Sequence, residues 1–287
     1  MKKSLLLLFA ICTTSMVWAQ TEPADTSYWK KGGSFNINFT RVTLNNWVGG
    51  GENSLSLSSL LKLYANKEKG KVSWANSLDI AYGLAKIGDK GFRKSDNQIL
   101  LLSKYSYQIK DNWGFTALAD FRTTMAPGYV YIQDPEDASK EIETEISRIM
   151  APGYLLKSVG FEYKKNNFFA LISPITGKST FVLDDKLSDV GAFGVDPGKR
   201  YRFELGALLK AGYKREIMKN VEFGTNLNLF TAYETFGHID VNWENVIQFK
   251  INDYLSTTFT ATLVYDDDII DEAQYKDVLN IGLLYKF

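Results

Sequence analysis

The chain of 287 residues has few of the residues that most often carry chemistry, with one cysteine, one histidine and 6 prolines. Cys12 lies in the N-terminal leader described below, so the rest of the chain has neither a disulfide nor thiol chemistry. A single histidine leaves little imidazole for acid–base catalysis. Beyond the leader the longest unbroken apolar run, Phe168 to Ile172, is far shorter than the ~20 residues of a membrane-spanning helix.

An excess of one charge is also missing, since 33 basic residues balance 33 acidic ones. This balance gives no reason to expect a nucleic-acid partner. The sequence is instead rich in hydrophobic residues (45%) and aromatic residues (14%), including 18 Phe, 16 Tyr and 6 Trp. Such a composition excludes disorder and a disulfide scaffold, and it favours β-strands.

Residues 1–19 have the pattern of a secretory signal peptide. Lys2 and Lys3 precede an apolar run from Leu5 to Ile11, and small residues near Ala19 form a cleavage pattern. We expect a mature chain beginning at Gln20, with residues 20–33 as a short periplasmic segment. An exported soluble protein and a closed barrel in an outer membrane both remain open at this point.

Apolar and polar side chains alternate along most of the mature chain. In the last segment Leu279, Ile281 and Leu283 alternate with polar or small residues, which places the two sets on opposite faces of a strand. The alternation predicts about twelve strands, an even number as bacterial single-chain barrels require. They lie near residues 34–42, 53–65, 71–85, 96–109, 112–125, 153–164, 167–174, 200–213, 219–233, 238–251, 254–265 and 279–287.

The connections between these segments are alternately short and long. Short ones lie near residues 67–70, 110–112, 164–167, 215–220 and 252–253, and the longer ones include 126–152 and 175–198. Short periplasmic turns and long outer loops are expected of an outer-membrane barrel, whereas a soluble β-sandwich gives no reason for them. The sequence therefore predicts an all-β fold, a transmembrane antiparallel up-and-down β-barrel of about 12 strands over residues 34–287, in the cell outer membrane.

Two further features indicate the partners of such a barrel. Aromatic residues lie near the short-turn ends of the predicted strands, as an interfacial girdle in outer-membrane lipid would. Examples are Trp74, Tyr107, Trp113, Phe168, Tyr213, Phe223 and Tyr254. The final residue, Phe287, ends an alternating strand, which resembles the signal that the barrel assembly machinery recognises during biogenesis.

Several motifs resemble those of a known family. They are Asn46 to Ser54 (NWVGGGENS), Trp74 to Gly83 (WANSLDIAYG), Ser103 to Tyr105, Ala126 to Tyr129, Ala151 to Tyr154, Ser173 to Lys178 and Gly191 to Val195. On these motifs the chain resembles an uncharacterised family of Gram-negative outer-membrane β-barrel proteins catalogued as a domain of unknown function. The resemblance implies a barrel and supplies no catalytic or binding residues.

The polar faces of the predicted strands supply the candidate lumen-lining residues, which are of mixed charge. They are Asp79, Lys104, Asp120, Arg122, Arg200, Arg202 and Glu204, and Asp240, Glu244 and Lys250 lie on similar faces. A barrel of this size can be filled by paired side chains or can hold a narrow aqueous path, and both readings stay open. The three arginines favour an anionic solute, although Asp120 and Glu204 oppose that preference.

The long outer loops contain segments that could close over the mouth of the barrel. Residues 134–150 are the one helical candidate, because Ile142, Ile146 and Ile149 recur at helical spacing. Such a helix would narrow the path or shield the ends of strands. Residues 175–198 are expected to form a second inward or overlying loop, since Phe181, Val182 and Leu183 are too apolar to stay in water.

Other candidate sites have weak patterns. The acidic stretch Asp266–Asp268 with Asp271 and Glu272 could hold a divalent cation, but its spacing matches no calcium loop, and a solvated charge run is favoured. His238 could be a general base, but neither a Gly-x-Ser-x-Gly elbow nor a zinc motif accompanies it. The run Gly49 to Gly51 precedes a strand, so a mobile loop is favoured over a phosphate cradle. We expect no metal and no cofactor.

Three functions follow from these patterns, in decreasing order of support. The first is a narrow channel or transport protein for small polar solutes. The second is a structural or assembly subunit of an outer-membrane complex that binds a protein partner through its outer loops. The third is an envelope hydrolase that depends on His238. The sequence favours a protein that is not an enzyme.

Overall fold

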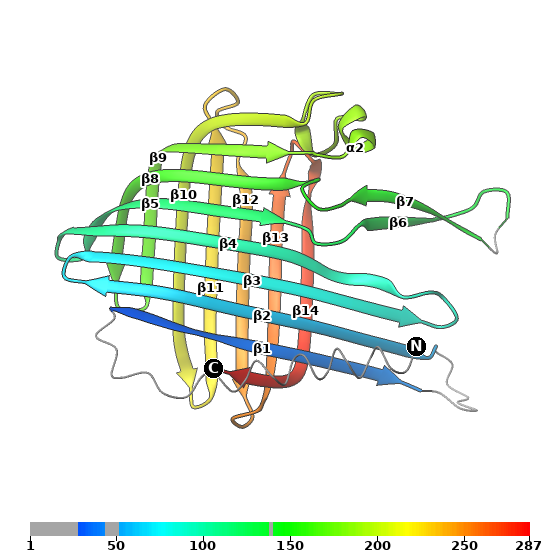
Figure 1. Ribbon diagram of the computed structural model, residues 1–287, viewed down its shortest axis with the longest axis horizontal. Coiled ribbons are helices and arrows are strands. Elements are labelled where there is room, and N and C mark those ends of the chain that lie inside the picture. Colours follow the sequence, from blue (N-terminus) through cyan, green and yellow to red (C-terminus); the bar gives the residue numbers. More distant parts are fainter. Residues whose placement is uncertain (1–27, 44–51, 138–139) are drawn as a thin grey trace, which may run out of the picture.

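The computed structural model describes residues 28–43, 52–137 and 140–287. Its main body is a closed antiparallel barrel in which neighbouring strands follow the order β1-β14-β13-β12-β11-β10-β9-β8-β5-β4-β3-β2 (Figure 1). The predicted all-β, up-and-down barrel of twelve strands is therefore confirmed. The predicted signal peptide and the glycine run at residues 49–51 lie outside the described residues.

The twelve barrel strands are long, and most exceed the five or six residues usual in soluble sheets. They are β1 (Trp29–Val42), β2 (Ser54–Lys69), β3 (Val72–Ile87), β4 (Arg93–Lys110), β5 (Trp113–Thr123), β8 (Gly153–Lys165), β9 (Phe168–Phe181), β10 (Tyr201–Met218), β11 (Val221–Ala232), β12 (Asp240–Lys250), β13 (Leu255–Asp266) and β14 (Ile270–Lys286).

The barrel closes where the first strand meets the last. Ser34–Asn38 of β1 pairs with residues 282–286 of β14, and Gly33 and Phe287 exchange backbone hydrogen bonds of 2.8 and 3.1 Å. A Cβ on Gly33 would lie 2.8 Å from the ring of Phe287, so glycine permits this close approach. The first strand begins at Trp29, earlier than the predicted start at residue 34, because residues 29–33 already pair with β2.

Tight turns join the strands at one end, here called the short-turn end. Gly70, Asp111, Asn166 and Asn220 each adopt positive φ in two-residue connections, which explains why Gly, Asn and Asp occupy them. The opposite end carries most of the longer connections and is here called the long-loop end. The alternation of short and long connections read from the sequence is present in the fold, except that only residues 267–269 join β13 to β14.

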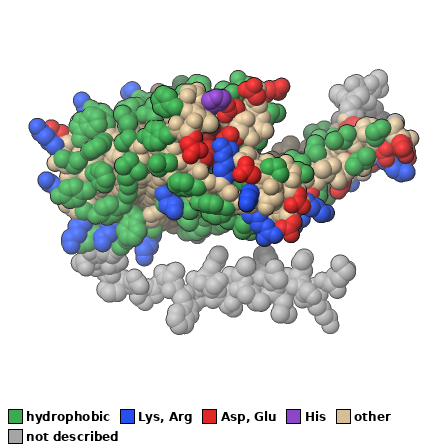
Figure 2. Space-filling view, turned by 90° about the horizontal axis from the view of Figure 1, so that it is seen from above, with side chains coloured by type: hydrophobic (Ala, Val, Ile, Leu, Met, Phe, Trp, Pro, Cys, Tyr) green, Lys and Arg blue, Asp and Glu red, His purple; other side chains and the backbone are tan. Residues whose placement is uncertain are grey.

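The barrel turns its apolar side chains outward. Along β10, Tyr201, Phe203 and Leu205 are about half exposed, whereas the alternate residues Glu204 and Leu208 are 7% and 4% exposed. Figure 2 shows hydrophobic side chains gathered over the barrel wall, with many charged ones toward the loops and the projecting hairpin. None of the described helices is long and apolar enough to cross a membrane.

A hairpin, not a helix, occupies most of the loop between β5 and β8. The predicted helix over residues 134–150 is wrong, because β6 (Gly128–Gln133) pairs with β7 (Glu141–Ser147) and projects away from the barrel (Figure 1). Ile142 and Ile146 are four residues apart, a spacing that fits one face of a strand as well as one face of a helix. The β-branched side chains of Ile142, Thr144 and Ile146 favour the strand.

The loop between β9 and β10 packs over part of the long-loop end. It begins after Phe181, later than the predicted residue 175, and contains α2 (Asp185–Asp189) and the short helix η2 (Ala192–Gly194). Asp184 caps α2 by accepting a hydrogen bond from the Leu187 amide. Val182, Leu187 and Val195 of this loop form an apolar cluster with Ala151, which lies just before β8. The expectation that Phe181, Val182 and Leu183 would leave water is met for Val182, which is fully buried, and is wrong for Leu183, which is 52% exposed.

Candidate functional site

The interior of the barrel is divided into two regions of different character. We call the inward side chains of β5 and β8–β11 the packed half, and those of β1–β3 and β12–β14 the open half; β4 lies between them. The packed half contains a cluster of Leu118, Leu171, Leu208, Phe230 and Ala232, each at most 6% exposed. Aliphatic contact of this kind excludes water from that side of the lumen.

Charged groups within the packed half are neutralised in close pairs. Lys104 of β4 binds Glu162 of β8, which also accepts hydrogen bonds from Ser106 at 3.0 Å and Thr116 at 3.3 Å. Glu162 is 5% exposed. A carboxylate buried this deeply needs such partners, because desolvation of an unpaired charge costs several kcal/mol.

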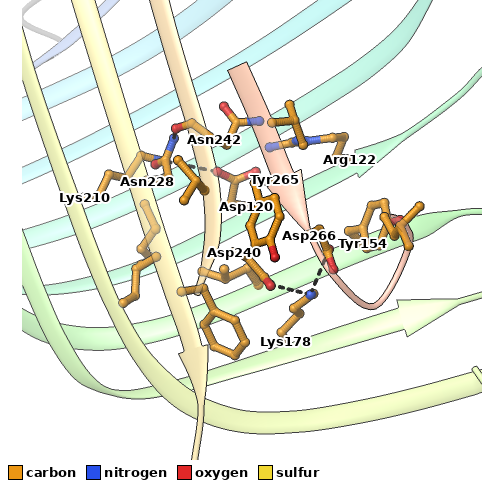
Figure 3. A pocket seen from close by; sticks show the side chains of 17 residues that line it. Asp120, Arg122, Tyr154, Lys178, Lys210, Asn228, Asp240, Asn242, Tyr265 and Asp266 are labelled. Atoms are coloured by element: carbon orange, nitrogen blue, oxygen red, sulfur yellow. Dashed lines mark hydrogen bonds and ion pairs between the residues drawn. The ribbon is translucent and has the colours of Figure 1, made fainter. Parts of the chain in front are cut away.

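A larger ionic cluster lies near the long-loop end. Lys178 Nζ of β9 lies 2.6 Å from Asp240 Oδ2, 3.3 Å from Asp266 Oδ2 and 3.7 Å from Glu204 Oε2, and Figure 3 shows the first two pairs. Arg202 in turn binds Glu204 at 3.1 Å and Asp268 at 2.9 Å. Opposite charges therefore join four strands and a loop at the long-loop end, where the packed half meets the open half.

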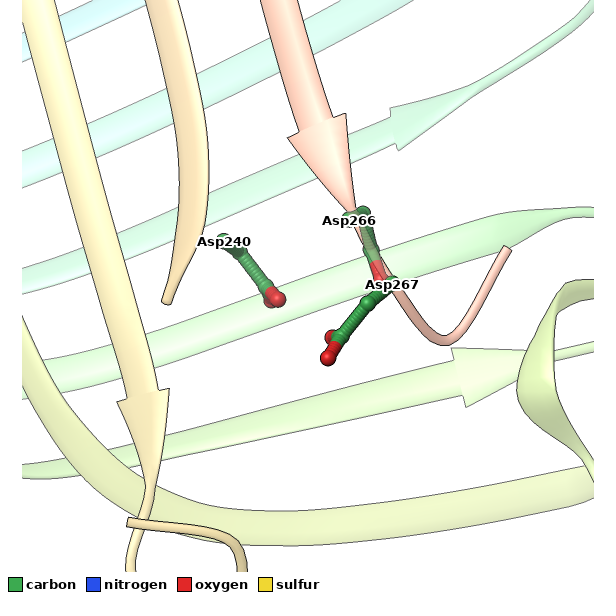
Figure 4. A group of neighbouring side chains, drawn as sticks. All are labelled: Asp240, Asp266 and Asp267. Carbon is green, nitrogen blue, oxygen red and sulfur yellow. The ribbon is translucent and has the colours of Figure 1, made fainter. Parts of the chain in front are cut away.

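Three carboxylates lie close enough together to suggest a metal site. Oxygen atoms of Asp240, Asp266 and Asp267 lie within 4.8 Å of one another (Figure 4). The ammonium of Lys178 is hydrogen-bonded to Asp240 and Asp266, however, and His238 Nδ1 is hydrogen-bonded to Asp267. The cations that balance these carboxylates are thus side chains of the protein, which fits the prediction of a charge run better than a calcium site.

His238 lies in the exposed loop between β11 and β12. Its hydrogen bond with Asp267 raises the pKa of the imidazole and lowers the pKa of the Asp267 carboxyl. Among the described residues, Asp267 is the side chain that hydrogen-bonds to the ring. The His238 ring therefore forms an ion pair with Asp267. Among the described residues no serine or other nucleophile is hydrogen-bonded to this ring, so the hydrolase hypothesis receives no support here. That the protein is not an enzyme stays a prediction.

The open half contains a polar cavity of about 400 Å³. β13 alone contributes Ser256, Thr258, Thr260 and Thr262 to its wall, while Asn36 and Asn38 of β1 also line it. Apolar residues such as Leu60 and Leu100 also line the cavity, among a larger number of polar residues. Hydroxyl and amide groups in such a wall can hydrogen-bond to water or to a polar solute.

Two smaller cavities lie at the long-loop end. One, of about 180 Å³, is lined by both the ionic groups of Figure 3 and the apolar cluster of the packed half. The other, of about 310 Å³, is lined by Lys94, Asp96 and Lys276. Arg122 and Tyr154 line both cavities, and Asp96 and Lys276 also line the polar cavity of the open half. The shared residues place the three spaces next to one another.

Six of the seven predicted lumen residues face the interior. Asp79 binds Lys62 at 3.2 Å in the open half, and Asp120 binds Lys210 at 3.1 Å in the packed half. The other inward residues were placed above: in the ion pair with Glu162, on the wall of the two smaller cavities, and in the ionic cluster. They are Lys104, Arg122, Arg202 and Glu204. The prediction is wrong for Arg200, which precedes β10 and pairs with Asp185 of α2. Its side chain is 57% exposed, because the strand begins only at Tyr201.

Two central residues were missed by the sequence reading. Glu162 lies in β8, where the predicted strand was weak, and Lys178 lies in a segment interpreted as a loop. Register shifts opposite Gly160 and Gly206 interrupt the alternation along β9, so that residues 171 and 173 face inward and then residues 176, 178 and 180 do. A strict period of two, continued from Ser173 across Pro174, would place Lys178 on the outward face of the strand.

Comparisons with protein families find two models that match parts of the chain. Residues 39–129 match a protein of unknown function (DUF3078), and residues 162–287 match a second protein of unknown function (DUF481). No curated protein matches the sequence. The family matches therefore supply no established activity.

Among solved structures the chain is similar to several outer-membrane proteins. An outer membrane channel from Pseudomonas putida F1 has 12% identity and a TM-score of 0.42, with 93% of this chain and 99% of that chain covered. The translocator domain of autotransporter NalP from Neisseria meningitidis has 9% identity and a TM-score of 0.39, with 99% and 96% covered. No role is transferred from similarities this low. With its closed barrel of twelve strands and its two matches to families of unknown function, the chain is similar to uncharacterised outer-membrane β-barrel proteins, as its motifs predicted.

Proposed function

We propose that this protein is a narrow channel for small polar solutes in the outer membrane of a Gram-negative cell. The observation that carries the proposal is the polar cavity of the open half, about 400 Å³ in volume. The apolar outer wall supports contact with outer-membrane lipid. The closed barrel leaves no unpaired edge strand, which is the condition for strands to lie in hydrocarbon.

The cavity extends along most of the barrel. On β14 it is lined by Lys276, toward the long-loop end, and by Lys286, at the short-turn end. About ten residues of strand span about 33 Å, and a tilt of about 40° reduces this to about 25 Å of height. The apolar band of a transmembrane barrel is also about 25 Å tall. A polar path of this length would cross the hydrocarbon layer.

The charges along this path are mixed. Lys62, Lys214, Lys276 and Lys286 line it together with Asp79, Asp96 and Glu244. Asp79 pairs with Lys62 and Asp96 with Lys276, so part of the charge is neutralised within the wall. Such a lining suits small polar solutes and water, with weak selection by charge.

Planar-bilayer recording of the purified barrel tests the proposal. Wild-type protein should give discrete conductance steps, and Thr260→Trp should lower the height of each step, because an indole would fill part of the polar cavity. Thr257→Trp is the matched control, since Thr257 pairs on the outward face with Phe249 and Ile281. Absence of steps in the wild type, or equal steps in both variants, would contradict a channel in the open half.

The outer-membrane location is tested separately by fractionation. We expect the mature protein to stay with the outer membrane and to require detergent for extraction, because side chains such as Phe39 and Leu279 are more than 60% exposed on the wall. The last strand also supports recognition by the barrel assembly machinery. Release of folded protein into aqueous buffer would contradict both.

A second candidate function is an assembly subunit that binds a protein partner through the β6–β7 hairpin. One face of the hairpin exposes the cross-strand pair Ile132 and Ile142, at 55% and 46%, together with Val130. The hairpin is held to the barrel on the Tyr131 side, where the Arg93 guanidinium lies 3.9 Å from the ring centroid. An apolar face that is held in position and left uncovered fits a partner protein.

Native extraction distinguishes this candidate from the channel. A complex larger than the monomer should be recovered from wild-type cells and lost in the double variant Ile132→Ser and Ile142→Ser. The control Leu183→Ser changes another exposed apolar loop residue, 52% exposed, outside the hairpin. Recovery of only a monomer from wild-type cells would remove the support for an assembly role.

A further inference from the structure

A cavity of about 180 Å³ lies inside the barrel at the long-loop end, where the packed half meets the open half. Its apolar wall is formed by Leu118, Leu156, Leu208 and Phe230, which belong to or pack on the core of the packed half. Its other wall is polar (Figure 3). A ligand that fits both walls has an apolar body and a polar head.

The charges that line the cavity indicate the sign of that head. Six charged side chains line it, and all three carboxylates are paired with lysines: Asp120 with Lys210, and both Asp240 and Asp266 with Lys178. The sixth, Arg122, makes no ion pair or hydrogen bond within the part of the chain that the structure describes. The three carboxylates and three cations balance in number, so the wall as a whole carries no excess charge. Arg122 is nevertheless the one cation of this lining that no described carboxylate binds, and a free guanidinium offers an anionic head a partner.

Two neutral groups add hydrogen-bonding capacity beside Arg122. The Tyr154 hydroxyl and the Asn242 side-chain amide both line the cavity, and within residues 28–43, 52–137 and 140–287 neither has a hydrogen-bond partner. A hydroxyl and an amide can each donate to an oxyanion. A guanidinium binds a carboxylate through two parallel hydrogen bonds, so these three side chains suit a carboxylate head.

The cavity adjoins a second cavity at the long-loop end. Arg122 and Tyr154 also line the neighbouring cavity, which is lined further by Lys94 and Lys276. The ammonium of Lys94 donates to the carbonyl oxygens of Ala126 and Pro127 at 3.0 and 2.9 Å, and it makes no ion pair with the residues that the structure describes. An anion that enters beside Lys94 would reach Arg122 next.

We propose that this cavity binds a small monocarboxylate with an apolar body, with the carboxylate on Arg122 and the body against Leu118, Leu156, Leu208 and Phe230. The size of the body follows from the volume, because an apolar cavity of about 150 Å³ accommodates benzene. An aromatic ring or a short aliphatic chain therefore fits. The proposal rests on the channel function, since it names a solute class that the channel would select.

Calorimetric titration of the detergent-solubilised full chain with benzoate tests the proposal. Benzoate should bind, and benzyl alcohol, which has the ring without the charge, should bind at least tenfold more weakly. Arg122→Gln should weaken benzoate binding about tenfold or more, as loss of a charged hydrogen-bonded pair does. Arg200→Gln, which changes an exposed arginine outside the cavity, should leave binding unchanged.

A second variant tests the apolar wall. Leu156→Trp should fill the cavity and abolish benzoate binding while Arg122 is kept. Circular dichroism and the heat-dependent shift of the folded barrel on gels check that each variant has folded. Equal binding of benzoate by wild type and Arg122→Gln, or no binding by folded wild type, would overturn the proposal.

Conductance separates a failure of this site from a failure of the channel. If wild-type protein conducts salt but does not bind benzoate, the carboxylate site is wrong and the channel stands. If benzoate binds through Arg122 but the barrel shows no conductance, the channel is wrong and the binding site stands on its own. If both occur, benzoate should also block the salt current in the wild type and not in Arg122→Gln.

Discussion

The packed half and the open half of the barrel are built from the same kind of strand but differ in the side chains that face inward. In the packed half, aliphatic residues touch across the lumen, and each carboxylate meets a cation or a hydroxyl, as Glu162 does. In the open half, threonines and asparagines line a cavity of about 400 Å³. One barrel therefore combines a filled side with a side that holds a polar cavity.

The difference concerns how a barrel of intermediate size arranges the side chains of its interior. Barrels of about eight strands are filled by side chains, and those of about sixteen strands leave an aqueous channel. With twelve strands, this protein has a packed cluster on one side of its interior and a polar cavity on the other. The ionic cluster around Lys178 and the carboxylate site proposed at Arg122 lie at the boundary between them.

The largest effect should come from breaking an ion pair in the packed half. Glu162→Ala leaves Lys104 without its carboxylate in a site from which water is excluded, and we expect a loss of about 3–5 kcal/mol in the free energy of unfolding. Asp79→Ala breaks the matching pair in the open half, where Lys62 is 53% exposed, and should cost under about 1 kcal/mol.

Urea unfolding in lipid vesicles, followed by tryptophan fluorescence, measures both changes. Equal losses for Glu162→Ala and Asp79→Ala would contradict the division of the interior. Replacement of both Lys104 and Glu162 by leucine should recover most of the loss, because no buried charge is then left unpaired.

A cavity made in the packed half should have the next largest effect. Leu208 is 4% exposed and packs in the core, so Leu208→Ala should lower the free energy of unfolding by about 2–5 kcal/mol. Leu60 lines the polar cavity of the open half, and Leu60→Ala should cost well under about 2 kcal/mol. The same unfolding experiment checks both, and a reversed order would show that the core lies elsewhere.

A smaller effect is expected on the outer wall of the packed half. Lys157 of β8 is exposed between the inward residues Leu156 and Ser158, and it pairs in register with Ala119 and Gly177. A lysine on a lipid-facing wall is unfavourable, so Lys157→Leu should stabilise the barrel in vesicles by about 1 kcal/mol. Lys157→Arg, which keeps the charge, should not. Destabilisation by leucine would indicate that this wall meets something other than lipid.

The smallest effect concerns the pH dependence of the loop that joins the two halves at the mouth. Asp267 raises the pKa of His238, so the contribution of this pair is fully present below the ordinary histidine pKa and is lost as the pH rises through the raised value. On the acid side it is lost as the pH falls through the lowered pKa of Asp267. The pair therefore acts between these two values.

Proton NMR can follow this titration without ambiguity, because the chain has one histidine. The imidazole should titrate above about 6.5 in the wild type and return toward that value in Asp267→Asn. Identical titration in both proteins would show that the pair does not form. Conductance should change little between them, since both residues lie in loops outside the polar cavity.

Some of these features were visible in the sequence and others were not, for physical reasons. Strands of the open half such as β14 were readable because their alternation is regular, as in Leu279, Ile281 and Leu283. The hairpin over Gly128–Ser147 was misread because isoleucines four residues apart satisfy both a helix and a strand. Lys178 was missed because bulges beside Gly160 and Gly206 change the register along β9.

The sequence by itself determined the class of fold, the approximate number of strands and the identity of most inward charges, because strand periodicity and turn chemistry are local properties. Only the tertiary structure decided which charges meet. The contact of Lys104 with Glu162, and of Lys178 with Asp240, joins residues about sixty positions apart. Barrel closure and register, which no single strand encodes, decide which half is filled. They also leave Arg122 beside a cavity without an ion pair to any described residue.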